Sequence, residues 1–155
     1  EPLDRYLREQ VTQDIRRRVA ACFVALADGQ LIAGYYTLAS ASLLLADLPA
    51  SIGRKLPRYP TVPAVRMGRL AVDQAFKGQG LGGALLADAL DRAARSEIAA
   101  HALMVDAKDE AAVAFYRHHG FIALPDSPRT LFLPLATALR SRNLQFSAAG
   151  ETHNN

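Results

Sequence analysis

The chain has 155 residues, half of them hydrophobic, and a formal net charge of +3. This length and composition exclude a disordered protein and predict a single domain with a substantial core. The longest apolar run, residues 19–27, is too short to cross a bilayer, and the lone Cys22 permits no internal disulfide. No signal-peptide pattern opens the chain, so we expect a cytoplasmic protein without membrane contact; because it begins at Glu1, we also expect an incomplete N-terminus.

The first predicted element is an amphipathic helix, because apolar residues recur at every fourth position from Leu3 to Val19. A basic cluster near its end consists of Arg16, Arg17 and Arg18. Two interpretations of this cluster stay open. It is either a solvated helix end, where cations complement the helix dipole, or a contact with nucleic acid.

Two strands are predicted next, at residues 21–26 and 31–38. They are joined by Asp28-Gly29, a pair typical of a hairpin turn. Residues 40–45 either continue the second strand or bend away from it. Within this strand, Gly34 indicates a bulge or a place where another group approaches the backbone closely.

An irregular segment with four prolines follows at residues 49–63. A loop of this length in a compact domain is either functional or partly disordered. A second basic cluster runs from this segment into the next strand and contains Arg54, Lys55, Arg58, Arg66 and Arg69. Its arginines suit phosphate recognition, although genomic base composition explains an excess of arginine equally well.

The most informative stretch is a strand predicted at residues 65–72, followed by a glycine-rich turn and a helix predicted at residues 80–99. Glycines let backbone N–H groups point into a concavity, and the start of a helix adds the positive end of its dipole. The pattern predicts a phosphate or pyrophosphate site, with a tight packing turn as the alternative. A P-loop is disfavoured because no Lys-Ser or Lys-Thr follows, and Asp106 lies too far along the chain for a dinucleotide-binding fingerprint.

The rest of the chain alternates short strands and helices. Residues 102–106 predict a buried strand, Asp109 caps a short helix that Gly120 ends, and residues 121–124 and 130–135 predict a closing hairpin. The order of elements predicts a mixed α/β fold. We expect a central mixed sheet of about six strands, antiparallel at its ends and parallel in the middle, with helices on both faces.

Two motifs carry a resemblance to a known family. Lys77-Gly78-Gln79-Gly80-Leu81-Gly82 is similar to motif A, Gln/Arg-x-x-Gly-x-Gly/Ala, of the GNAT family of acyl-CoA N-acyltransferases, with lysine at the first position. Residues 109–121 resemble motif B, Asn-x-x-Ala-x-x-Phe-Tyr-x-x-x-Gly-Phe, with Asp109 in place of asparagine. The resemblance implies the GNAT fold in a single domain at residues 1–143, and we expect a disordered polar tail at residues 144–155.

The resemblance also implies acetyl-CoA as the cofactor and no metal. In this family two central strands splay apart, the pantetheine arm lies between them, and the glycine turn holds the pyrophosphate. Tyr116 is then the general acid that protonates the departing thiolate, with a packed aromatic as its alternative role; no residue stands out as a general base. The implied cofactor-binding residues are Leu70, Ala71, Val72, Lys77, Gly78, Gln79, Gly80, Leu81, Gly82, Gly83, Asp109, Ala112 and Phe115.

Further stretches look like the GNAT toxins of type II toxin–antitoxin systems, namely residues 3–7, 16–19, 34–38, 68–73 and 105–108. Toxins of that subfamily acetylate the α-amino group of aminoacyl-tRNA and stop translation. The resemblance implies a homodimer, a ribbon-helix-helix antitoxin, and the two basic clusters as nucleic-acid-binding residues. The alternatives are a GNAT enzyme for a small amine or a protein N-terminus, and a non-catalytic acyl-CoA-binding module.

Overall fold

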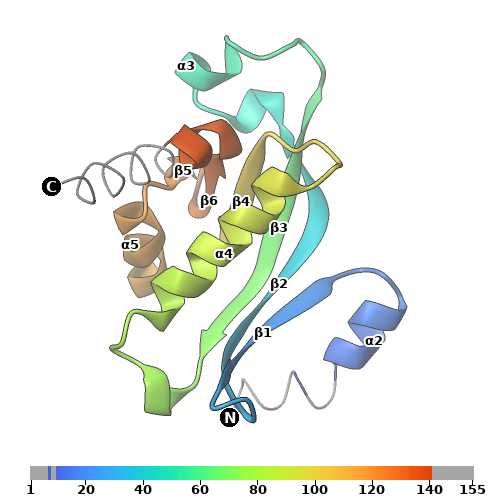
Figure 1. Cartoon of the computed structure of the whole chain (residues 1–155). Coiled ribbons are helices and arrows are strands. Elements are labelled where there is room, and N and C mark those ends of the chain that lie inside the picture. Colours follow the sequence, from blue (N-terminus) through green and yellow to red (C-terminus); the bar gives the residue numbers. More distant parts are fainter. Residues whose placement is uncertain (1–6, 8–9, 141–155) are drawn as a thin grey trace, which may run out of the picture.

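The computed structural model describes residue 7 and residues 10–140, and in this part of the chain a six-stranded sheet forms the centre of the molecule (Figure 1). The strand order is β1-β2-β3-β4-β6-β5; β3 and β4 are parallel, and all other neighbours are antiparallel. In chain order the elements are α2 (Val11–Arg16), β1 (Ala21–Ala27), β2 (Leu31–Leu44), the 3-10 helix η1 (Leu45–Asp47), α3 (Ala50–Gly53), β3 (Thr61–Val72), the 3-10 helix η2 (Gln74–Phe76), α4 (Leu81–Arg95), β4 (Ala102–Asp106), α5 (Glu110–His118), β5 (Ile122–Leu124) and β6 (Ser127–Pro134).

This architecture confirms the predicted mixed α/β fold with a mixed sheet. The second strand continues to Leu44, as one of the two interpretations of residues 40–45 expected. The division into a domain at residues 1–143 and a tail stays a prediction, because residues 141–155 lie outside the described part. The same holds for the predicted start of the first helix, apart from Leu7.

Several predicted boundaries are wrong: β3 begins at Thr61 rather than residue 65, β6 begins at Ser127 rather than residue 130, and three further differences follow. The first helix ends at Arg16 rather than Val19, because the backbone turns left-handed at Arg18, with φ of +58°. The helix α4 ends at Arg95 rather than residue 99, because the Ser96 hydroxyl accepts a hydrogen bond from the Ile98 N–H at 3.2 Å and stabilises a turn. The segment at residues 49–63 contains α3, in which the Ile52 and Gly53 N–H groups donate to the carbonyl of Pro49.

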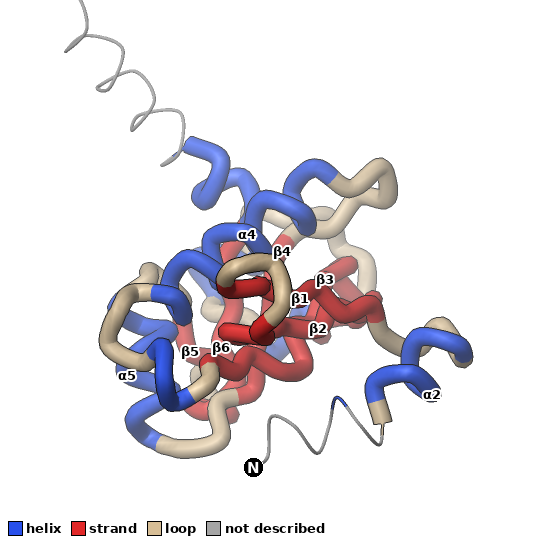
Figure 2. The backbone as a smooth tube through the Cα atoms, turned by 60° about the horizontal axis from the view of Figure 1, so that its bottom comes forward, coloured by secondary structure: helices blue, strands red, loops and turns tan. Residues whose placement is uncertain are grey.

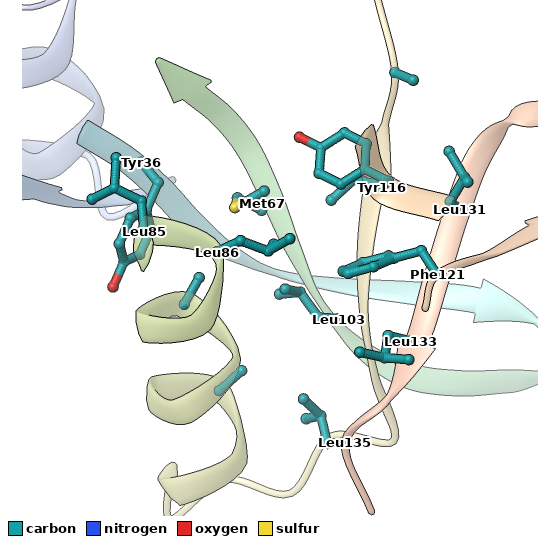
Figure 3. Packing of buried hydrophobic residues seen from close by; sticks show 14 residues of the cluster. Tyr36, Met67, Leu85, Leu86, Leu103, Tyr116, Phe121, Leu131, Leu133 and Leu135 are labelled. Atoms are coloured by element: carbon teal, nitrogen blue, oxygen red, sulfur yellow. The ribbon is translucent and has the colours of Figure 1, made fainter. Parts of the chain in front are cut away.

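Two hydrophobic layers pack on opposite faces of the sheet. On one face α4 and α5 cover a cluster that includes Tyr36, Leu86, Leu103, Tyr116 and Leu131 (Figure 3). The other face carries a cluster around Phe132 beneath α3, and a smaller cluster in which Tyr35 packs against α2. Figure 2 shows α4 and α5 grouped on one side of the strands, with α2 standing apart from them. Within residues 10–140, no helix is long and apolar enough to cross a membrane.

Candidate active site

The main feature of the site is a gap where β3 and β4 separate. Parallel pairing joins the two strands from Ala64–Ala102 to Met67–Val105, and β4 ends one residue later. β3 runs on to Val72 and keeps β2 as its neighbour on one side. On the other side, no strand of the described chain pairs with residues 68–72. The Asp73 N–H donates to the Ala33 carbonyl, so by alternation the backbone groups of Ala71 face β2, while those of Leu70 and Val72 face the gap and need a partner there.

A β-bulge bends β3 where the gap opens. The register with β2 shifts between Thr37–Arg69 and Leu38–Met67, which makes Gly68 the extra residue. A Cβ atom on Gly68 would lie 3.1 Å from the Thr37 Oγ1 atom, and that hydroxyl also accepts a hydrogen bond from the Arg69 N–H at 3.1 Å. Neither Thr37 nor Gly68 is among the predicted site residues, although an isolated glycine within a predicted strand is the usual signal for a bulge.

The glycine-rich turn leads from β3 into α4, as predicted. Gly78 and Gly80 have φ of +83° and +78°, a left-handed conformation that favours glycine. Gly80 is the N-cap residue of α4, so the first-turn N–H groups of the helix have no intrahelical acceptor. These N–H groups and the helix dipole suit a pyrophosphate. Lys77 and Gln79 are exposed on the same turn.

The start of α4 packs against α5, which brings the two predicted motifs together. A Cβ atom on Gly82 would lie 3.6 Å from Phe115 Cζ, and one on Gly83 would lie 3.1 Å from His119 Nε2. The Phe115 and His119 rings are 4.6 Å apart and form a platform for the α4 helix. The Cβ side of Gly82 and Gly83 therefore faces α5, and a contact of their backbone N–H groups with the cofactor stays a prediction.

Asp109 has a structural role at the beginning of α5. Its Oδ1 atom accepts a hydrogen bond from the Ala112 N–H at 2.8 Å, so it is the N-cap residue that the sequence predicts. Ala112 is half-buried against the core beneath α5. A contact of Asp109 or Ala112 with the cofactor stays a prediction.

Tyr116 lies on α5 between this platform and the core. Its ring contacts Phe115 edge-on at 5.2 Å and Phe121 at 5.5 Å, and its hydroxyl points away from Phe121, Leu131 and Leu133 in Figure 3. Burial raises the pKa of the Tyr116 phenol to about 12. The side chain is therefore neutral and able to donate a proton at physiological pH, although the same burial makes it a weaker acid.

The raised pKa of Tyr116 predicts a specific loss of stability at high pH. Because the folded pKa of about 12 lies above the ordinary value of 10, the stabilisation is complete below pH 10 and is lost as the pH rises toward 12. We expect the free energy of unfolding to fall more steeply over this range in the wild type than in Tyr116→Phe, as measured by urea titrations. Equal slopes in the two proteins would contradict the assignment.

The predicted nucleic-acid-binding residues are exposed but form separate groups. Arg16, Arg17 and Arg18 lie at the end of α2, while Arg54, Lys55 and Arg58 follow α3 at the top of Figure 1. On β3, Arg66 lies two residues after Ala64, and Arg69 lies two residues before Ala71. Residues two apart on a strand share a face, and both alanines belong to the clusters opposite α4. These two arginines therefore lie on that face of the sheet. Within one chain the predicted residues do not converge into one cluster.

Some of these cations have partners within the protein. The Arg66 guanidinium donates to the Asp106 Oδ2 atom, and Arg54 Nε donates to the Ala50 carbonyl at 3.1 Å. Burial raises the pKa of the Tyr35 phenol, and the positive charge of the nearby Arg69 partly offsets that effect. Arg66 and Arg69 are therefore less suited to phosphate contacts than the prediction assumes. No group of three histidine, cysteine, aspartate or glutamate side chains within residues 10–140 could hold a metal ion.

The comparisons with known proteins agree with this geometry. The model of the acetyltransferase (GNAT) domain family matches residues 3–131. A tRNA-acetylating toxin of Mycobacterium tuberculosis (strain ATCC 25618 / H37Rv) is 38% identical over 138 residues, which cover 88% of this chain and 81% of the relative.

Among solved structures, a tyrosine-to-phenylalanine mutant of KacT superimposes with a TM-score of 0.81 at 29% identity, covering 90% of this chain and 85% of that one. AtaT complexed with acetyl-methionyl-tRNAfMet gives a TM-score of 0.80 at 31% identity, with 94% and 86% covered. A mutant AtaT toxin bound to the C-terminus of the antitoxin AtaR and acetyl-CoA gives 0.72 at 27% identity, with 89% and 81% covered. The predicted family is confirmed: this chain belongs to the GNAT acetyltransferases.

Proposed function

We propose that this chain is an acetyl-CoA-dependent N-acetyltransferase that modifies the α-amino group of aminoacyl-tRNA and acts as a toxin by blocking translation. The observation that carries the proposal is the gap between β3 and β4, with the glycine turn following β3 and the Tyr116 helix, α5, packed against the start of α4. The relatives named for tRNA acetylation support the choice of acceptor.

The residues around the gap fit the chemistry of this cofactor. Acetyl-CoA supplies the acetyl group as a thioester. The unpaired backbone groups of Leu70 and Val72, on either side of Ala71, offer hydrogen bonds to the amides of an extended pantetheine arm, and a backbone N–H there can stabilise the oxyanion. The N–H groups that follow Gly80 would hold its pyrophosphate.

Tyr116 completes the proton balance of the reaction. The amine nitrogen forms a bond to the acetyl carbon, and the carbon–sulfur bond breaks. Tyr116 gives its proton to the departing sulfur and regains one from the nitrogen, so the products are an amide and a thiol. An α-amino group of an aminoacyl ester has a pKa below the peptide value of about 7.7–8.0 and loses its proton readily, which explains why a strong general base is not required.

The test of this proposal uses purified protein, labelled acetyl-CoA and a set of charged tRNAs. We expect label on the aminoacyl group of one or more tRNAs, and none on the same tRNAs after deacylation. Transfer of label to a small amine or to a protein N-terminus, with none to any aminoacyl-tRNA, would reject the toxin assignment in favour of an ordinary GNAT enzyme.

The contribution of Lys77 to cofactor binding is predicted to be modest. Lys77 is exposed, so its ammonium group adds only a screened attraction, and Lys77→Ala should weaken coenzyme A binding by about two- to fivefold. Gly80→Ala should weaken it more, because alanine at φ of +78° costs about 1–2 kcal/mol and displaces the N–H groups of the turn. Calorimetric titration of coenzyme A distinguishes the two contributions, and a larger effect of Lys77→Ala would show that the side chain dominates.

The proposal also includes two protein partners: a second copy of the chain and a ribbon-helix-helix antitoxin. The complex of AtaT with the C-terminus of AtaR supports an antitoxin partner. A homodimer would let the separate basic groups of two chains act on one tRNA. Mass measurement in solution, with and without the product of a neighbouring small reading frame, tests both partners.

A further inference from the structure

The cluster at the end of β4 has no role in the chemistry described so far. Asp106 is the last residue of this strand, and half of its side-chain surface is exposed. Its Oδ2 atom accepts a hydrogen bond from Arg66 on β3, and its Oδ1 atom accepts one from the Thr130 hydroxyl on β6 at 2.9 Å. Two different strands therefore hold one carboxylate in a fixed position.

This carboxylate lies where the gap begins. The last paired residues of β3 and β4 are Met67 and Val105, and Asp106 directly follows Val105. Asp106 lies two residues after Met104 on β4, and residues two apart on a strand share a face. Met104 belongs to the cluster opposite α4, so the Asp106 side chain lies on the face of the sheet away from that helix. On that face α2 packs near Tyr35 and α3 near Phe132, and neither cluster includes Asp106.

An acceptor substrate has to approach from this face. The turn proposed for the pyrophosphate opens α4, and α4 and α5 cover the other face. An amine that attacks a thioester within the gap therefore passes the face of the sheet that carries Asp106 before it reaches the acetyl carbon. An ionised carboxylate has about four acceptor positions, and Arg66 and Thr130 use two of them. The remaining positions suit the N–H groups of an amine.

We propose that Asp106 binds the α-amino group of the acceptor and directs its nitrogen toward the thioester, with Arg66 and Thr130 as the residues that position the carboxylate. This inference rests on the proposed function and names a residue that recognises the reacting group. It also reassigns Arg66, which holds Asp106 instead of contacting a phosphate. After transfer the nitrogen is an amide with one N–H in place of the two of the neutral amine, so the contact with Asp106 weakens in the product.

The test compares aminoacyl-tRNA with the same tRNA after deacylation. Asp106→Asn keeps the size of the side chain and an oxygen for Thr130, but removes the charge. We expect it to raise KM for aminoacyl-tRNA, and its Kd measured without acetyl-CoA, by about 10- to 100-fold, the range for hydrogen bonds to charged groups. The Kd of the deacylated tRNA and the KM for acetyl-CoA should change by less than about twofold, since neither ligand presents the amine.

Two control variants separate this role from general effects. Asp91→Asn makes the same chemical change at an aspartate on α4, away from the site, that pairs with Arg95 at 2.9 Å. It should leave the affinities for aminoacyl-tRNA and for deacylated tRNA unchanged. Arg58→Gln removes a predicted phosphate contact and should weaken aminoacyl-tRNA and deacylated tRNA equally. Thr130→Val should produce a smaller, selective loss than Asp106→Asn, with thermal unfolding used to verify that each variant is folded.

Each outcome decides a different question. If Asp106→Asn weakens both forms of tRNA equally, or neither, the inference is overturned although the proposed function stands. If the wild type modifies no aminoacyl-tRNA, the proposed function fails. The KM of whichever amine it does acetylate then tests Asp106 in the same way, and an unchanged value would overturn the inference.

Discussion

Replacing Tyr116 by phenylalanine is expected to lower kcat by about 10²- to 10⁴-fold, the usual contribution of a positioned general acid. The phenol is neutral at physiological pH because burial raises its pKa to about 12, so the wild type is fully in its proton-donating form. Phenylalanine keeps the ring contacts with Phe115 and Phe121 but cannot protonate the departing sulfur. The affinity for acetyl-CoA should therefore stay within about twofold. Single-turnover assays and calorimetric titration measure the two quantities separately.

Tyr36→Phe is the matched control for this substitution. Tyr36 is also buried, and its hydroxyl donates to the Asp88 carboxylate on α4. We expect this variant to lose stability while each folded molecule keeps its kcat. If Tyr116→Phe retains wild-type turnover, Tyr116 is a packing residue and the proton comes from another donor, which the reaction rate in heavy water would help to identify.

Gly34→Ala is expected to lower the free energy of unfolding by about 1–3 kcal/mol, the range for overpacking of a core. A Cβ atom at this buried position would lie 2.7 Å from the Ala71 carbonyl oxygen and 2.9 Å from Leu85 Cδ1. The Leu85 side chain can rotate, but the carbonyl belongs to the backbone of β3 beside the gap. The strand must shift to relieve the contact, so the KM for acetyl-CoA should also rise.

Gly53→Ala provides the control for Gly34→Ala. A Cβ atom on Gly53 would lie 3.6 Å from the Leu45 carbonyl oxygen, an ordinary contact distance, and alanine is favoured over glycine within a helix. Gly53→Ala should therefore leave stability unchanged or raise it by up to about 1 kcal/mol. Urea unfolding of both variants measures the difference, and a wild-type KM in Gly34→Ala would show that the edge of β3 does not bind the cofactor.

The sequence by itself determined the features that depend on local patterns. Alternation and turn residues predicted the strands, and left-handed glycines predicted the turn before α4, because only glycine adopts that conformation without strain. The aspartate cap of α5 was also predictable, since its bond to the Ala112 N–H spans three residues. The two motifs, each contiguous in the chain, were sufficient to indicate the family and the cofactor.

Only the tertiary structure decided what depends on segments far apart in the chain. The gap exists because the pairing of β3 with β4 stops at Met67 while β3 continues, and no local pattern encodes the length of a partner strand. Likewise, Asp106 meets Arg66 and Thr130 across two different strands, contacts that residue spacing does not reveal. The contact with Asp106 also shows that Arg66, one of the predicted phosphate ligands, is already paired within the protein. Charge composition counts cations but does not show which of them are paired.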